Sequence, residues 1–166
     1  MSEKRMAAFG VLLLVDFVLS AVMLVTDKNL QTDFGFHSAY YLHWYGVLAM
    51  AIVDLVVALA LLVSSSPSVA QQMSSSVRRI GVIAALVWTI VAIVVSVGIV
   101  TTWSQVGFAN MSQFEQYLFG VTPYPGALYY IPWLYDLLLA AYIVTAVVGA
   151  LAIRRAPTPP ATAPAS

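Results

Sequence analysis

The sequence predicts an all-α integral membrane protein with four transmembrane helices in an up-down-up-down bundle. Of its 166 residues, 61% are hydrophobic and only 8% are charged, whereas a soluble domain is nearer half apolar and about a quarter charged. The apolar residues also fall into four long runs, each close to the ~20 residues that a helix needs to cross the hydrocarbon core. Helices are expected because lipid cannot satisfy unpaired backbone groups.

Each predicted span is bounded by polar or turn-forming residues. We place the spans at about Met6 to Thr26, Leu42 to Val63, Ile80 to Thr101 and Tyr130 to Ile153. The first run follows charged residues, as in a signal peptide, but it is too long and contains Asp16. Residues 1–155 are therefore predicted to form a single four-helix transmembrane domain.

The segments between and after the spans differ in character. Residues 64–79 are rich in serine, which predicts a flexible linker. Within 102–129, apolar and aromatic residues recur every three or four positions, which predicts a short amphipathic helix on the membrane surface. The alternative is a partly ordered loop over the mouth of the bundle. Residues 156–166 are rich in proline and alanine and are expected to be a disordered tail.

The orientation in the membrane follows from the lysine and arginine residues, because cytoplasmic loops close to span ends are enriched in them. One side of the predicted bundle carries Lys4, Arg5, Arg78, Arg79, Arg154 and Arg155. Only Lys28 falls on the other side. The distribution predicts a multi-pass protein of the cell membrane with both termini in the cytoplasm.

Several classes of function are disfavoured by composition and by missing motifs. Seven basic and seven acidic residues cancel, so there is no basic stripe for a nucleic-acid partner. The chain has no cysteine, which removes thiolate nucleophiles, disulfides and iron–sulfur ligation. It also lacks a glycine-rich phosphate loop and the common nucleophile and zinc motifs. We therefore expect neither a nucleotide partner nor an enzyme.

Three carboxylates lie inside predicted spans: Asp16, Asp54 and Asp136. An ionisable residue at the centre of a transmembrane helix costs roughly 2.5–3.5 kcal/mol, so it usually faces the bundle interior. Asp16 and Asp54 fall at similar depths on antiparallel helices and are expected to face each other, while Asp136 lies about two turns from the outer surface. Because desolvation and mutual repulsion disfavour two charges, at least one of the pair is expected to be protonated near neutral pH.

The alternative to proton handling is a structural role in helix packing. Each aspartate would then bond to a polar residue of the bundle or to a partner subunit, and the candidates within the chain are Ser20, Thr89, Ser96, Tyr142 and Thr145. A small residue follows each aspartate by four positions, on the same helix face: Ser20, Ala58 and Ala140. Gly81 with Ala85, and Ala146 with Ala150, are expected to provide further close helix contacts.

The outer face offers a second group of candidate residues, for a cofactor or an interface: His37, Tyr41, His43, Trp44 and Trp133. The two histidines could join Asp33 or Glu115 around a divalent metal. A haem or quinone edge is conceivable in a larger assembly. The alternative is that these rings anchor the chain at the lipid headgroups. No cofactor is predicted, because two histidines on facing helices, as haem needs, are missing.

Three functions follow, in order of preference. The first is a noncatalytic, accessory or structural subunit of a larger membrane complex, plausibly respiratory or transport. The second is a small proton-coupled carrier or channel that uses Asp16 and Asp54, with Asp136 nearer the outer mouth. The third is a redox protein with a cofactor bound at the outer face. The expected partners are membrane lipid and either other membrane subunits or further copies of the chain.

Overall fold

Four long helices packed as a bundle make up most of the described part of the chain, in agreement with the predicted fold class. The computed structural model describes residues 3–26, 38–104 and 133–154, with side chains described at 3–25, 45–98, 100 and 133–154. The long helices are α1 (Glu3–Thr26), α3 (Ser38–Ser65), α5 (Ser75–Ser104) and α7 (Trp133–Ile153). Each is long and apolar enough to span a membrane. The first three predicted spans lie within α1, α3 and α5, which extend up to five residues further at their ends, and the fourth coincides with α7 except for residues 130–132, which lie outside the described part.

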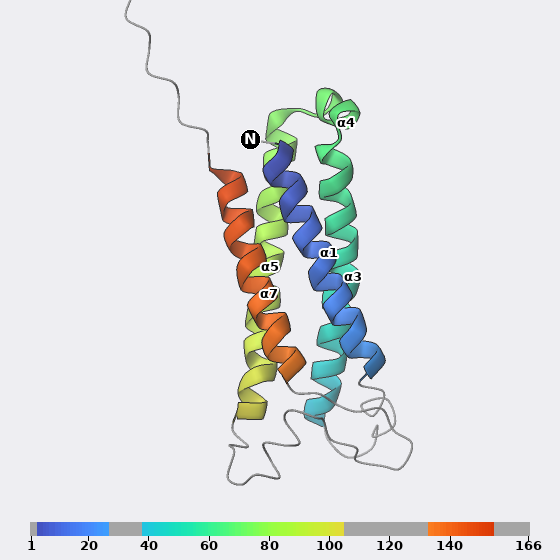
Figure 1. Cartoon of the computed structure of the whole chain (residues 1–166), viewed down its shortest axis with the longest axis vertical. Helices are drawn as coiled ribbons and strands as arrows, with labels where there is room; N and C mark the ends of the chain where they lie inside the picture. Colours follow the sequence, from blue (N-terminus) through green and yellow to red (C-terminus); the bar gives the residue numbers. More distant parts are fainter. Residues whose placement is uncertain (1–2, 27–37, 105–132, 155–166) are drawn as a thin grey trace, which may run out of the picture.

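The helices alternate in direction, and helices that follow each other in the sequence are antiparallel and lie side by side (Figure 1). α1 packs against α3 and α7, and α5 packs against the same two helices. This arrangement places α1 diagonally opposite α5, and α3 diagonally opposite α7. α1 begins and α7 ends at the same end of the bundle, beside the short helix α4 (Pro67–Gln72). We refer to it below as the α4 end.

The prediction of a flexible linker at residues 64–79 is wrong. α3 continues to Ser65, α4 occupies Pro67–Gln72, and α5 begins at Ser75. Pro67 occupies the first turn of α4, where a missing backbone N–H loses no helical hydrogen bond. Ala70 is buried, so α4 also gains contact with the bundle. Composition alone did not indicate this helix, because serine is rare inside helices but common at their ends.

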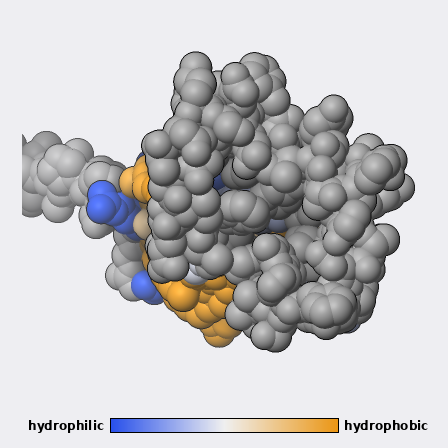
Figure 2. All heavy atoms as spheres, turned by 90° about the horizontal axis from the view of Figure 1, so that it is seen from below, coloured by the Kyte–Doolittle hydropathy of each residue, from blue (hydrophilic) through white to orange (hydrophobic). Residues whose placement is uncertain are grey.

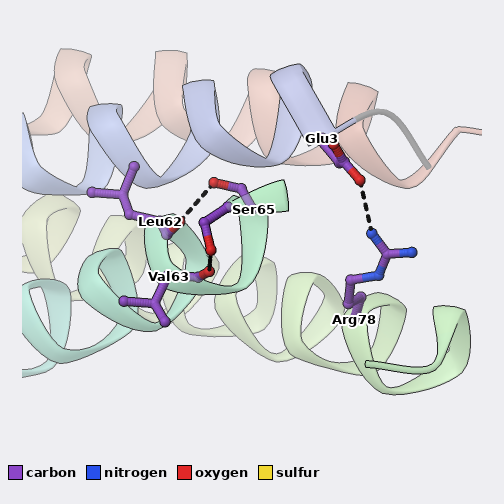
Figure 3. A network of polar contacts seen from close by, with 6 residues as sticks. Glu3, Leu62, Val63, Ser65 and Arg78 are labelled. Atoms are coloured by element: carbon purple, nitrogen blue, oxygen red, sulfur yellow. Dashed lines mark hydrogen bonds and ion pairs between the residues drawn. The ribbon is translucent and has the colours of Figure 1, made fainter. Parts of the chain in front are cut away.

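Two serines of this segment satisfy carbonyl groups at the end of α3 (Figure 3). The Ser65 hydroxyl donates to the Leu62 carbonyl at 2.8 Å, and the Ser66 hydroxyl donates to the Val63 carbonyl at 2.7 Å. The last carbonyls of a helix have no partner within it. The two serine hydroxyls therefore cap the C-terminal end of α3, and a single residue, Ser66, separates α3 from α4.

Buried residues recur mostly at spacings of three or four along each long helix. In α7 they are Tyr135, Leu138, Tyr142, Thr145, Gly149 and Ala152. This spacing keeps one narrow stripe of each helix turned to the bundle axis. The opposite faces carry exposed valine, leucine and isoleucine, and the part of the side wall visible in Figure 2 is hydrophobic. An apolar outer wall suits contact with lipid.

The apolar core is divided into two clusters along the bundle. The cluster towards the α4 end contains Met6, Phe9, Leu13, Ala58, Leu61, Val82, Ala85 and Ala152. The cluster towards the opposite end contains Met23, Val47, Met50, Ala92, Tyr135, Leu138 and Tyr142. In each long helix, buried polar residues lie between the members of the two clusters or at their edge. The bundle is therefore polar in the middle and apolar on both sides of it.

Some of the small residues expected at helix contacts lie elsewhere. Ala140, Ala150 and Gly81 are exposed, and a Cβ atom built on Gly81 would meet nothing within 4 Å. The close approaches involve Gly10 and Gly149 instead. These two lie within the buried stripes of their helices, whereas the three predicted residues lie beside the stripes. Ser20, Ala58 and Ala85 are buried as predicted.

Substitution of Gly149 by alanine is expected to destabilise the bundle by about 1–3 kcal/mol. The new Cβ would lie 2.8 Å from Phe9 Cζ, and Phe9 is fully buried, so the ring has no free space to move into. Thermal unfolding in detergent, followed by circular dichroism, measures the effect. Gly81→Ala is the matched control: its methyl group meets open space, and alanine favours helix by up to about 1 kcal/mol. Equal stability of the two variants would contradict the close packing of Phe9.

Candidate functional site: a buried polar layer

Six side chains from all four long helices form a polar layer across the middle of the bundle. They are Asp16 and Ser20 of α1, Asp54 of α3, Trp88 of α5, and Tyr142 and Thr145 of α7. All but Trp88, which is half-buried, are at most 1% exposed. The spacings of four in α1 and three in α7 keep each pair on its buried stripe. The layer lies about 20 Å along α1 from its first residue, at 1.5 Å per residue.

Asp54 is held by hydrogen bonds from two other helices. The indole N–H of Trp88 donates to Oδ1 at 2.8 Å, and the Tyr142 hydroxyl donates to Oδ2. Both carboxyl oxygens therefore have a partner, and α3 is tied to α5 and α7 at mid-bundle. The expectation that an aspartate bonds to a polar residue of the bundle is confirmed here for Tyr142.

Trp88 was missed by the analysis of the sequence. An indole N–H in the middle of a transmembrane helix must find an acceptor, because the surrounding lipid has none. Trp88 lies well inside the predicted span from Ile80 to Thr101. Its position could therefore have indicated a partner for one of the aspartates.

Asp16 is buried in the same layer, but without the bonds that Asp54 has. Neither of its carboxyl oxygens accepts a hydrogen bond from any residue in the described part of the chain. The hydroxyl groups of Ser20 and Thr145 are likewise buried without a hydrogen-bond partner there. The Thr145 hydroxyl lies close to the Asp16 carboxyl but does not meet the geometry of a hydrogen bond, and the Asp54 carboxyl acts on Asp16 by charge repulsion. The structure thus brings Asp16 and Asp54 together, as their similar depths predicted.

Tyr142 links the two halves of the layer. Its hydroxyl bonds to Asp54 and also lies within the electrostatic influence of Ser20 and Asp16. A buried polar atom without a partner lowers the stability of the fold by about 1–3 kcal/mol. The burial of Asp16 is therefore unfavourable for folding, whereas the burial of the hydrogen-bonded Asp54 is not. Groups that are unfavourable for folding and yet fully buried are characteristic of functional sites.

The chain matches no protein-family model, no curated protein and no solved structure in the three comparisons made.

Two other predicted hydrogen-bond candidates do not reach an aspartate. The Thr89 hydroxyl donates to the Ala85 carbonyl of its own helix at 2.9 Å, and the Ser96 hydroxyl contacts the sulfur of Met50 at 4.0 Å. Asp136 is only half-buried, in the first turn of α7. It lies six residues before Tyr142, about 9 Å along the helix axis, and is not part of the polar layer.

The outer-face candidates fall mostly outside the described residues. His37, Asp33 and Glu115 lie outside them, and the side chains of Tyr41, His43 and Trp44 also lie outside the described part although α3 includes their backbone. Trp133 begins α7 and is partly exposed. The predicted amphipathic helix, whose apolar residues run from Phe108 to Phe119, and the tail 156–166 lie outside the described residues as well. Among the described residues, no three histidine or acidic side chains are grouped to hold a metal.

Charged residues gather at the α4 end, away from the polar layer. Arg78 Nη1 lies 3.5 Å from Glu3 Oε1, which joins α5 to α1 (Figure 3). Arg5 Nη1 donates to the Leu151 carbonyl at 3.2 Å, near the end of α7, where a positive charge also suits the helix dipole. Such exposed contacts contribute little to stability, so they mainly mark this end of the bundle as positively charged.

Proposed function

We propose that this chain is a small carrier that moves protons across the membrane, in which Asp16 takes up and releases the proton. The observation that carries the proposal is the fully buried Asp16 carboxyl, whose oxygens accept no hydrogen bond from the described residues. Asp54 beside it has both oxygens bonded. Because their surroundings differ, the two carboxyl groups are suited to different roles: Asp16 can hold a proton and Asp54 can receive it. Two carboxyl groups that served only helix packing would be expected to have similar hydrogen bonds.

Burial without partners favours the neutral, protonated form of Asp16 over its charged form. A carboxyl group in this state can give up its proton to a neighbouring acceptor and later recover it. Intramembrane carboxylates of pumps and transporters act as proton relays in this way, and coupling-ion sites of carriers lie near the bilayer midplane. The polar layer occupies the corresponding depth in this bundle.

A carrier is favoured over an open channel by the apolar clusters on both sides of the polar layer. Water cannot pass continuously through well-packed side chains such as Phe9, Leu13 and Leu138, all of which are almost completely buried. Access to Asp16 from either side then requires a rearrangement of one cluster. Alternate access of that kind is the property that distinguishes a carrier from a channel.

The proposed orientation places the α4 end in the cytoplasm of a cell-membrane protein. Support comes from the basic residues described at that end: Lys4, Arg5, Arg78, Arg79 and Arg154. Enrichment of lysine and arginine is the usual property of cytoplasmic ends. In this orientation the proton would be exchanged between the cytoplasm and the outer face.

The other two hypotheses have no comparable support among the described residues. An accessory subunit needs a surface for its partner, but the described outer faces are as suited to lipid as to another helix. A redox role depends on outer-face side chains that, apart from Trp133, lie outside the described part. Both remain predictions from the sequence, as does assembly with further copies of the chain.

The test is proton flux into liposomes that contain the purified full chain. We expect the wild type to transport protons down a pH gradient, and Asp16→Asn to lower the rate at least about tenfold, because the amide cannot exchange a proton. Glu3→Gln is the matched control, since it removes a carboxylate from the exposed α4 end. Flux that is unchanged in Asp16→Asn would overturn the proposal.

A further inference from the structure

Tyr142, which is bonded to Asp54, can both give and accept a proton. The Tyr142 hydroxyl donates to Asp54 Oδ2, and its oxygen keeps lone pairs that can accept a hydrogen bond. Trp88 also donates to Asp54, but an indole N–H has no acceptor capacity. Of the two residues bonded to Asp54, only Tyr142 is therefore chemically able to pass a proton on.

The Asp16 side of the polar layer contains four buried oxygen atoms without a hydrogen-bond partner in the described residues. They are both carboxyl oxygens of Asp16 and the hydroxyl oxygens of Ser20 and Thr145. All three side chains are at least 99% buried, and they come from the neighbouring helices α1 and α7. Buried polar atoms in folded proteins are nearly always satisfied. A water molecule satisfies them where two to four polar groups converge.

We propose that a water molecule binds between Asp16, Ser20 and Thr145, and that it joins the Tyr142 hydroxyl in a proton relay from Asp16 to Asp54. The inference rests on the proposed function, because a relay matters only if Asp16 exchanges its proton. Beyond that function, the inference names water as the ligand of the site and Tyr142 as the residue that passes the proton on.

The transfer balances at every atom. The Asp16 carboxyl gives its proton to the water, and the water gives one of its own protons to the Tyr142 oxygen. The Tyr142 hydroxyl gives its original proton to Asp54 Oδ2, along the hydrogen bond already present. One O–H bond breaks and one forms at the water and at the tyrosine, so both end with the protons they had. Only Asp16 and Asp54 change their charge.

The first test compares two variants that each remove one hydrogen bond from Asp54. In the liposome assay on the full chain, Tyr142→Phe is expected to lower proton flux at least about tenfold, because the hydroxyl that passes the proton is gone. Trp88→Phe is expected to lower it less, since only support for Asp54 is lost. Equal reductions in the two variants would overturn the relay, because Tyr142 would then merely hold Asp54 in place.

The second test concerns the water and uses two threonines, both fully buried. Thr145→Val removes a partner of the proposed water, whereas Thr89→Val removes a hydroxyl that bonds within its own helix. We expect slower flux in Thr145→Val and unchanged flux in Thr89→Val. These changes keep the shape of the side chain, so they also test the relay if Tyr142→Phe does not fold. Equal flux in both threonine variants would overturn the water site.

The outcomes for the relay and for proton transport can be told apart. If Asp16→Asn stops the flux while Tyr142→Phe and Thr145→Val do not slow it, transport by Asp16 stands and the relay is overturned. If the wild type carries no flux, or Asp16→Asn carries as much as the wild type, the proposed function is overturned, and the relay with it.

Discussion

Leucine in place of Asp16 is expected to stabilise the bundle by about 2 kcal/mol. A buried polar group that lacks good partners is unfavourable, and its replacement by an apolar residue often stabilises a protein by about 1–4 kcal/mol. The Asp16 oxygens accept no hydrogen bond from the described residues. The substitution therefore removes a group that is costly to bury and breaks no hydrogen bond to another described side chain, so that only the contact with the proposed water is lost. Loss of transport with a gain in stability is the combination typical of a functional residue.

The measurement is the free energy of unfolding in mixed detergent micelles, with denaturing detergent as the variable and circular dichroism as the signal. Val18→Leu provides the control, since Val18 is an exposed residue of the same helix and such changes usually stay within about 0.5 kcal/mol. A clear loss of stability in Asp16→Leu would contradict the description of Asp16 as unpartnered, and would point to a structural role instead.

The same substitution at Asp54 is expected to act in the opposite direction, with a loss of about 2–5 kcal/mol, because the donors on Trp88 and Tyr142 would be left buried without an acceptor. Unfolding in the same micelles measures the loss. Asp54→Leu combined with Tyr142→Phe should recover part of it, since one of the stranded donors is removed as well. If Asp54→Leu is as stable as the wild type, the two hydrogen bonds do not hold the helices together.

Much of the fold could be predicted from the sequence, because the bilayer imposes simple rules. A span requires about 20 apolar residues, and the four runs satisfy this without ambiguity. Short polar segments between the runs produce an alternating order, and depth along antiparallel helices placed Asp16 at the level of Asp54. Counting along the helices was sufficient for that, since each residue adds about 1.5 Å.

The inward face of each helix was harder to predict. A transmembrane helix is apolar all round, so no polar face shows which side is exposed. An error of one residue rotates the expected face by about 100°. Gly81 and Ala140 were expected at contacts for this reason, and both are exposed. The polar residues gave the better guide, because Ser20, Tyr142 and Thr145 are all buried beside the aspartates.

The choice of hydrogen-bond partners depends on geometry that no pattern of spacing contains. Asp16 and Asp54 have similar depths and similar apolar neighbours in sequence, yet only Asp54 meets Trp88 and the Tyr142 hydroxyl. The Tyr142 hydroxyl donates to Asp54 and not to Asp16, although both carboxyl groups are buried in the same layer. The distinction between the two aspartates therefore emerged only with the structure.

If Asp16 exchanges a proton as proposed, the depth of the polar layer would also make that exchange sensitive to voltage. A positive charge that crosses the whole membrane changes its energy by about 2.3 kcal/mol per 100 mV. Asp16 lies near the middle of α1, so a proton that reaches it from one surface would cross roughly half of that potential, worth about 1.1 kcal/mol at 100 mV. The occupancy of Asp16 would then depend on the side from which it is reached, and an energised membrane would favour uptake from its positive face.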